Sequence, residues 1–122
     1  MNFLFNNLFF TYWLNFLIKK INPEYVHSHE LSTSSILCLK ARLSFKGVFP
    51  KWIVTNWGSD LYFFYKKKNF KKNLKKVLQF SNFYSAECRR DYNIAKKIGI
   101  KANFLDCITN SGGISLQSVK RF

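Results

Sequence analysis

Residues 50–61, PKWIVTNWGSDL, decide the fold class of this chain. The stretch begins with a proline, continues with bulky and β-branched residues at 52–56, and reaches a glycine at Gly58. A short apolar run between a proline and a glycine is typical of a buried strand. The polar residues Ser59 and Asp60 then follow directly after the end of that strand.

Outward from this strand, short apolar runs alternate with segments of helical periodicity. In the segment 69–80, the apolar positions Phe70, Leu74, Val77 and Leu78 lie on one face, opposite four lysines. Strands alternating with helices of this length favour an α/β fold, with one parallel sheet and helices on both faces. The predicted strands are 24–29, 52–56, 82–86 and 103–107, and the predicted helices are 3–20, 32–45, 69–80 and 89–98.

The composition is that of one small, strongly basic domain. The 122 residues include 20 Lys and Arg against 6 Asp and Glu, so the formal net charge is +14, while 48% of the residues are hydrophobic. Such a balance indicates an anionic partner (nucleic acid, anionic lipid or a phosphorylated substrate) or simply a solvated lysine surface. The charge alone leaves both interpretations open.

The cysteines indicate reduced thiols in a cytoplasmic protein. Cys38, Cys88 and Cys107 are widely spaced and form no CxxC pair. We expect Cys38 and Cys107 to pack in apolar surroundings. His27 and His29 have no third ligand at a useful spacing, so no metal site is expected.

The most apolar stretch is 3–18. It lacks the basic start and the small-residue cleavage site of a signal peptide. It is also shorter than the roughly 20 residues of a spanning helix, and it contains Asn6, Asn7 and Asn15. An internal helix packed on the sheet is therefore favoured, with a membrane-inserted helix as the alternative.

Ligands of open parallel sheets bind at the carboxyl ends of the strands. After the second predicted strand, an exposed Trp57 could stack on a sugar ring, Gly58 would allow close backbone approach, and Ser59 and Asp60 could bind hydroxyl groups. The alternative is a tight turn in which Asp60 caps a helix and Trp57 packs in the core. The other positions that this rule selects are His29 and Glu30, Glu87, and 110–113.

Other motifs carry little chemistry. His27 and His29 lie two apart on a strand and should face the same side, with His29 nearer the ligand edge. There is no P-loop, no GxGxxG and no GxSxG. Residues 111–113, SGG, predict a turn, with a phosphate-binding nest as the minor alternative.

Four motifs together resemble the family-4 retaining glycosyltransferases. The stretch 21–30, INPEYVHSHE, is similar to the family's PD-x-VH-x-H strand, and 50–61 to its P-x-[IV]-x-T-x-[HW]-GSD segment. Residues 80–100, FSNFYSAECRRDYNIAKKIGI, resemble its AD-x-[IV]-x-S strand with the following helix. NSGGIS at 110–115 resembles its NG-G-[IV]-D turn. The order and spacing of the four make the resemblance fairly specific.

The resemblance implies an enzyme of the GT-B type, with two Rossmann-like domains facing each other across a cleft. In that family the N-terminal domain mainly holds the acceptor, and the C-terminal domain holds the nucleotide sugar. We therefore expect residues 1–122 to be part of the N-terminal domain, without its first strand and glycine-rich loop and without the donor-binding domain. Alone, such a chain should be inactive. Trp57 stands where many members have His, so no catalytic residue is assigned.

The implied function is sugar transfer from a nucleotide-sugar donor, in the synthesis of cell-envelope material, polysaccharide or other glycans. No cofactor is implied beyond that donor. The expected partners are a sugar or glycolipid acceptor, an anionic membrane surface contacted electrostatically by the lysines of 66–76, and a separate chain carrying the C-terminal domain. Rival interpretations are a basic module binding nucleic acid through 62–76, and a non-catalytic remnant. The residues expected to bind the acceptor are His29, Glu30, Trp57, Gly58, Ser59, Asp60, Asn110, Gly112 and Gly113.

Overall fold

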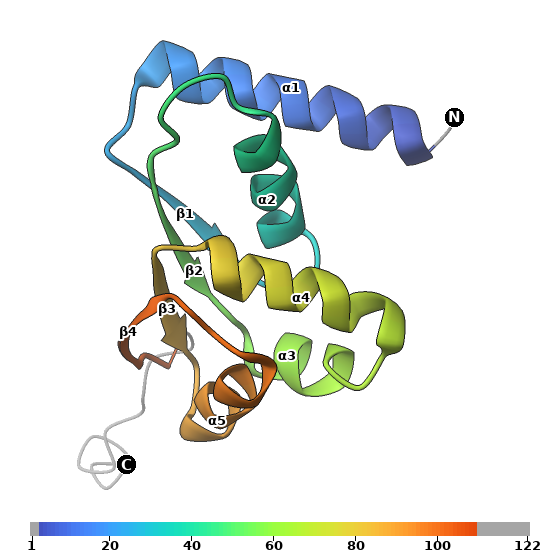
Figure 1. The fold of residues 1–122 in the computed structure, drawn as a ribbon, viewed down its shortest axis with the longest axis vertical. Helices are drawn as coiled ribbons and strands as arrows, with labels where there is room; N and C mark the ends of the chain where they lie inside the picture. The colour runs from blue at the N-terminus through green and yellow to red at the C-terminus, as the bar shows by residue number, and fades with distance from the viewer. Residues whose placement is uncertain (1–2, 110–122) are drawn as a thin grey trace, which may run out of the picture.

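The computed structural model describes residues 3–109, which form an α/β unit (Figure 1). Strands and helices alternate along the chain, as the sequence predicts. The strands are β1 (Tyr25–His29), β2 (Lys51–Thr55), β3 (Phe83–Ala86) and β4 (Asn103–Cys107). The helices are α1 (Phe3–Ile21), α2 (Ser34–Ser44), α3 (Gly58–Phe64), α4 (Lys68–Phe80) and α5 (Arg89–Ile98).

The four strands form one parallel sheet in the order β1-β2-β3-β4. Val26 pairs with Trp52, Val54 with Tyr84, and Tyr84 in turn with Phe104. The predicted parallel sheet and its four strands are thereby confirmed. A register shift between Tyr84 and Ala86 interrupts the pairing of β3 with β4.

The helices α2, α4 and α5 pack on one face of this sheet (Figure 1). Helices on both faces were expected from the sequence, and in the described residues that detail is wrong. The reason is the strand order. When right-handed crossovers always step to the next strand in the same direction, every crossover helix lies on the same side.

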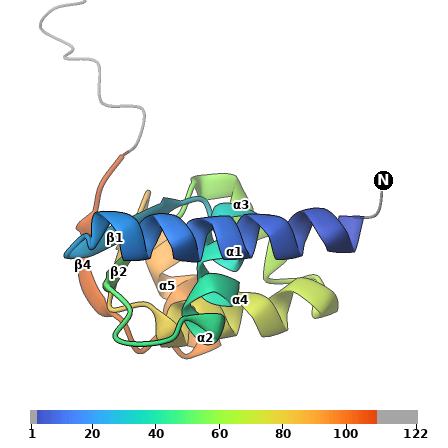
Figure 2. The same ribbon diagram turned by 90° about the horizontal axis from the view of Figure 1, so that it is seen from above.

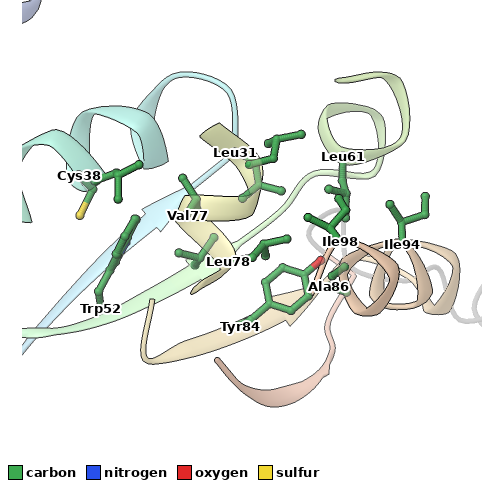
Figure 3. Close-up of a cluster of buried hydrophobic side chains, with 14 residues drawn as sticks. Leu31, Cys38, Trp52, Leu61, Val77, Leu78, Tyr84, Ala86, Ile94 and Ile98 are labelled. Atoms are coloured by element: carbon green, nitrogen blue, oxygen red, sulfur yellow. The ribbon is translucent and has the colours of Figure 1, made fainter. Parts of the chain in front are cut away.

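The core lies between this helix layer and the sheet (Figure 3). Trp52, Val54 and Tyr84 from the two middle strands are fully buried beneath Leu74, Val77 and Leu78 of α4. The indole Nε1 of Trp52 donates to Ser28 Oγ at 2.8 Å, so the largest core side chain carries no unsatisfied donor. Because β2 and β3 are covered by this layer, they hold the loops that follow them in fixed positions.

The opposite face of the sheet carries Tyr25, Ile53, Phe83 and Leu105. Tyr25 is 44% exposed and Leu105 50% exposed. The rings of Tyr25 and Phe83 lie 6.4 Å apart across β2. In the described part of the chain, no helix packs over this second face. We call these four residues the open face.

Helix α4 has the predicted amphipathic arrangement. Leu74, Val77 and Leu78 are buried and Phe70 is partly buried, while Lys71, Lys72, Lys75 and Lys76 are exposed. Helix α5 ends at Gly99, whose φ of 94° lies in the left-handed region, as predicted for that position. The Gly99 N–H donates to the carbonyl groups of Ala95 and Lys96.

Helix α1 differs from the expectation. It packs against α2 rather than on the sheet; it runs along the top of the molecule in Figure 1 and crosses in front of the other elements in Figure 2. Only Thr11 and Ile18 among its described side chains are buried, and most of its apolar side chains face outward. No helix in the described residues is long and apolar enough to cross a membrane.

Helix α3 was not among the predicted helices. It is seven residues long and begins at Gly58, where the sequence suggested a binding loop or a tight turn with Asp60 capping a helix of unstated extent. Asp60 lies in its first turn and accepts a hydrogen bond from the backbone of Trp57, the residue that precedes the helix. An acidic residue at the third helical position is a known helix-start signal that was available in the sequence.

Candidate functional site

The loops after β1, β2 and β3 meet at the carboxyl edge of the sheet, as the topology requires. The carboxylate of Asp60 joins the first two loops. Its Oδ2 accepts hydrogen bonds from the backbone N–H of Leu31 at 2.7 Å and of Trp57 at 3.1 Å, and its Oδ1 accepts one from Leu61 N at 2.5 Å. Asp60 is 4% exposed, so it organises the edge from within rather than facing a ligand.

Two opposing effects set the ionisation of Asp60. Burial raises the pKa of its carboxyl to about 6, and the backbone N–H groups of Leu31, Trp57 and Leu61 act in the lowering direction. The negative charge of Glu30 adds a smaller raising effect. Asp60 therefore titrates nearer to neutral pH than an ordinary aspartate.

Gly58 joins the second loop to the third. Its N–H donates to Glu87 Oε2, and its carbonyl oxygen accepts a hydrogen bond from Arg90 Nη2 at 2.6 Å. A Cβ at position 58 would lie 2.5 Å from the Glu87 carboxylate. The glycine is required here by close approach rather than by an unusual backbone angle.

A buried polar network lies beneath this loop. Asn56 Nδ2 donates to Asp91 Oδ2 at 2.9 Å, and the Tyr84 hydroxyl donates to Asn56 Oδ1 at 2.6 Å. Asp91 also accepts from Arg90 Nε at 2.8 Å. Burial, followed by the charge of Asp91, raises the pKa of Tyr84, so its hydroxyl stays a donor. The network fixes Arg90, which in turn holds Gly58.

Glu30 closes the first loop onto α2. Its backbone has a φ of 75°, an uncommon left-handed conformation for a residue with a side chain. The carboxylate accepts hydrogen bonds from Thr33 N at 2.8 Å and Ser34 N at 3.2 Å, and from the backbone and side chain of Ser32. Glu30 thus occupies the N-terminal end of α2 with its own negative charge.

A chain of polar side chains crosses the same edge on the other side of the sheet. His27 Nε2 lies 2.8 Å from Thr55 Oγ1, which lies 2.6 Å from Ser85 Oγ. The rings of His27 and His29 are 4.0 Å apart, which confirms that they face the same side. Burial and the neighbouring His29 lower the pKa of His27. Within the described residues, no three His, Cys, Asp or Glu side chains lie close enough to hold a metal ion.

Three of the predicted residues face outward at this edge. Trp57 is 51% exposed, and Ser59 and His29 are also exposed. The expected alternative for this segment is therefore half right, because Asp60 does bond the start of a helix whereas Trp57 does not enter the core. What remains accessible is the indole of Trp57 and the hydroxyl of Ser59, on a loop held by the buried carboxylate of Asp60, and the imidazole of His29 at the end of β1.

A family model described as glycosyl transferase 4-like matches residues 2–88. This match spans well over half of the chain and includes β1, β2, β3 and the edge loops after the first two strands. The chain belongs to the glycosyl transferase 4-like family. No curated protein matches the chain.

In this glycosyltransferase domain, the predicted site residues fall into two groups. Trp57, Ser59 and His29 face outward, while Glu30, Gly58 and Asp60 hold the loops through the contacts described above. The predicted residues Asn110, Gly112 and Gly113 lie outside the described residues.

Three residues at the carboxyl edge of the sheet were not selected from the sequence, namely Asn56, Arg90 and Asp91. Asn56 was assigned only to a strand, and the other two to the start of a helix. One signal was present, because Arg90 and Asp91 lie within one helical turn after Glu87, which the edge rule had selected. Hydrogen bonds between residues far apart in the sequence, such as the one from Asn56 to Asp91 across 35 residues, leave no local pattern to find.

Proposed function

We propose that this chain is the acceptor-binding part of a glycosyltransferase that uses a nucleotide-sugar donor. The observation that carries the proposal is the half-exposed Trp57 indole on a braced loop at the ligand edge of the sheet. A flat apolar ring suits the C–H face of a sugar, and a fixed loop lowers the entropy cost of binding.

Each of the three outward-facing residues contacts a different part of the acceptor. Trp57 stacks on the sugar ring, Ser59 binds a hydroxyl group, and His29 contacts the acceptor from the neighbouring strand end. Glu30, Gly58 and Asp60 act as positioning residues, because their polar groups are engaged with the backbone. We assign no nucleophile or general base in this chain.

The donor half of the reaction belongs on a second Rossmann-like domain, in the same polypeptide or in a partner chain. The nucleotide sugar would bind mainly there, and this edge would present the acceptor across the cleft. Transfer needs both reactants held together, so this chain alone should show no turnover. We place the acceptor among the glycans or glycolipids of a cell envelope or polysaccharide, which accords with the resemblance.

The chain supplies a matched control for testing this site, because Trp13 and Trp57 are both 51% exposed. Saturation-transfer NMR with a panel of methyl glycosides and free nucleotide sugars would detect contact with the protein. From the signal followed against glycoside concentration, we expect a dissociation constant about tenfold higher in Trp57→Ala, the equivalent of about 1.4 kcal/mol, and an unchanged one in Trp13→Ala. An unchanged dissociation constant in Trp57→Ala, or an equal rise in both variants, would contradict the proposal.

The nucleic-acid alternative has weaker support. The Tyr62 ring, at the start of the segment 62–76, already has Arg90 at 4.5 Å and Lys66 at 5.0 Å from its centroid. A ring covered by cations is less open to stacking with bases. Sub-micromolar, steeply salt-dependent binding of single-stranded RNA would instead favour that alternative.

A further inference from the structure

Helix α1 has its apolar side chains on the outside. The large hydrophobic side chains on its outer surface are between 51% and 72% exposed. At 100° per residue, Phe9, Tyr12, Trp13 and Phe16 fall on one broad face. The residues that form this apolar face are Leu8, Phe9, Phe10, Tyr12, Trp13 and Phe16.

Polar contacts with α2 hold the helix in this orientation. Asn15 Nδ2 donates to Ser44 Oγ at 2.9 Å, and Ser44 in turn donates to the carbonyl oxygen of Lys40 at 3.0 Å. Thr11 and Ile18 are buried on the same side of the helix as Asn15. An amphipathic helix of a water-exposed domain normally shows the reverse pattern, with polar residues outward.

Basic residues border the apolar face directly. A cavity of about 350 Å³ is lined by Tyr12 and Phe16 together with Lys19 and Lys46. Lys20 adds a second cation in the last turn of α1, and the helix contains no acidic residue. The surface therefore combines aromatic side chains with positive charge, the composition of helices that lie in a membrane interface.

Two copies of this chain are a poor alternative occupant of the apolar face. Each copy carries a formal net charge of +14, so close approach is opposed by electrostatic repulsion. An anionic lipid surface turns the same charge into attraction, which falls off within about 8–10 Å at ordinary ionic strength. Trp and Tyr also favour the headgroup level of a bilayer.

We infer that α1 lies flat in the interface of an anionic bilayer, with its apolar face in the acyl region and Lys19, Lys20 and Lys46 at the headgroups. The helix lies on the membrane rather than across it. This attachment differs from the purely electrostatic contact through the lysines of α4 that the sequence suggested. It rests on side chains remote from the acceptor edge and does not depend on the proposed transfer reaction.

The test compares two sets of substitutions in the whole chain. One variant carries Phe9→Gln, Trp13→Gln and Phe16→Gln, which remove apolar surface but keep good helix formers at exposed positions. The other carries Lys72→Gln, Lys75→Gln and Lys76→Gln on the exposed side of α4. Circular dichroism and thermal unfolding verify that both variants keep the wild-type fold.

Binding is measured by co-sedimentation with vesicles of phosphatidylcholine alone and of phosphatidylcholine with about 30 mol% phosphatidylglycerol. We expect wild-type binding to the anionic vesicles that partly survives about 0.5 M salt, a loss of at least about tenfold in the α1 variant, and a smaller loss in the α4 variant. Brominated acyl chains should quench Trp13 fluorescence, measured as the signal lost in Trp13→Phe.

Three results would overturn the inference. They are the absence of vesicle binding, binding that the α4 substitutions abolish while the α1 substitutions leave it unchanged, and no quenching of Trp13 by brominated acyl chains. If the α1 variant unfolds, the quenching measurement on the wild-type protein decides alone. A glycoside dissociation constant that is unchanged in Trp57→Ala would contradict the proposed function but would leave all of these membrane results unaffected, so the two proposals can fail separately.

Discussion

A single carboxylate sets the shape of the ligand edge at the residue scale. Asp60 accepts backbone hydrogen bonds from Leu31, Trp57 and Leu61 while almost fully buried. Removing an acceptor that serves buried donors leaves those donors unsatisfied. The cost should therefore greatly exceed that of changing an exposed neighbour.

We expect Asp60→Ala to lower the free energy of unfolding by about 2–3 kcal/mol, because three donors lose a charged acceptor. The exposed Ser59→Ala control should change it by less than about 0.5 kcal/mol. Urea unfolding followed by circular dichroism measures both. Equal effects of the two substitutions would show that the carboxylate does not hold the loops.

The pH dependence of the same residue gives a second test. Burial places the pKa of Asp60 at about 6 in the folded chain, above the ordinary value of 3.8 that applies when unfolded. Between these two values the folded state binds the proton that the unfolded state lacks, so this group stabilises the fold as the pH falls from 7 to 4. As the pH falls from 7 to 4, the free energy of unfolding of the wild type should therefore rise relative to that of Asp60→Asn. Urea unfolding at several pH values measures both. A difference that stays flat or falls would contradict the raised pKa.

The residue types predicted which positions lie at the ligand edge but not which way each side chain faces. The edge rule selected Glu30, Trp57, Ser59 and Asp60, and all four lie at the predicted edge. The carboxylates turned inward because backbone N–H groups of the loops had to be satisfied. That requirement depends on the three-dimensional course of the loops, which the local sequence does not encode.

At the element scale, the left-handed residue that ends α5 predicts a loss of stability on substitution. Gly99 ends α5 with a φ of 94°, and a Cβ there would meet nothing within 4 Å. Gly99→Ala should therefore lower the free energy of unfolding through backbone strain alone, by about 1–2 kcal/mol. Thermal unfolding of this variant, beside Lys97→Ala as the last-turn control, measures the effect. A neutral Gly99→Ala would mean that the chain end of α5 relaxes out of the left-handed conformation.

Elements with strong periodicity were predicted well, and those without it were not. Helix α4 was expected over 69–80 and spans Lys68–Phe80, because apolar and lysine positions separate cleanly around it. Helix α3 was missed because seven residues are too few for a periodic signal. Helix α1 was expected in nearly its true span, yet its packing on α2 was not, because its apolar residues surround much of the helix.

For the whole molecule, the net charge opposes self-association and the exposed apolar surface favours it. The open face exposes Tyr25 and Leu105, and the net charge of +14 opposes the approach of a second copy. Salt screens the repulsion but leaves the apolar attraction, so self-association should increase with ionic strength. We expect a mainly monomeric species at about 20 mM salt and oligomers at about 0.5 M salt by sedimentation velocity.

The variant Leu105→Lys adds a charge to the open face and should reduce that association. The matched control is Val48→Lys, since Val48 is exposed in the loop between α2 and β2 and is not part of the open face. Association that weakens as salt is added, or that both substitutions reduce equally, would exclude the open face as its cause.

The number of sheet faces covered by helices was the global property that could not be predicted from the sequence. Strand and helix alternation predicts a parallel sheet, and that much is confirmed. Whether helices cover one face of the sheet or both depends on the strand order, and the hydrophobic periodicity of a single segment does not indicate that order. The sequential order β1-β2-β3-β4 put α2, α4 and α5 on the same side.

The same strand order bears on how the chain could fold during synthesis. Within residues 3–109, every strand pairs only with the strand next to it along the chain, as Val54 does with Tyr84, so no pairing among these strands must wait for a distant segment. Low sequence separation between partners shortens the loops that must close and speeds folding. Each βα unit can dock on the previous one as it leaves the ribosome, and the sheet grows in the direction of translation.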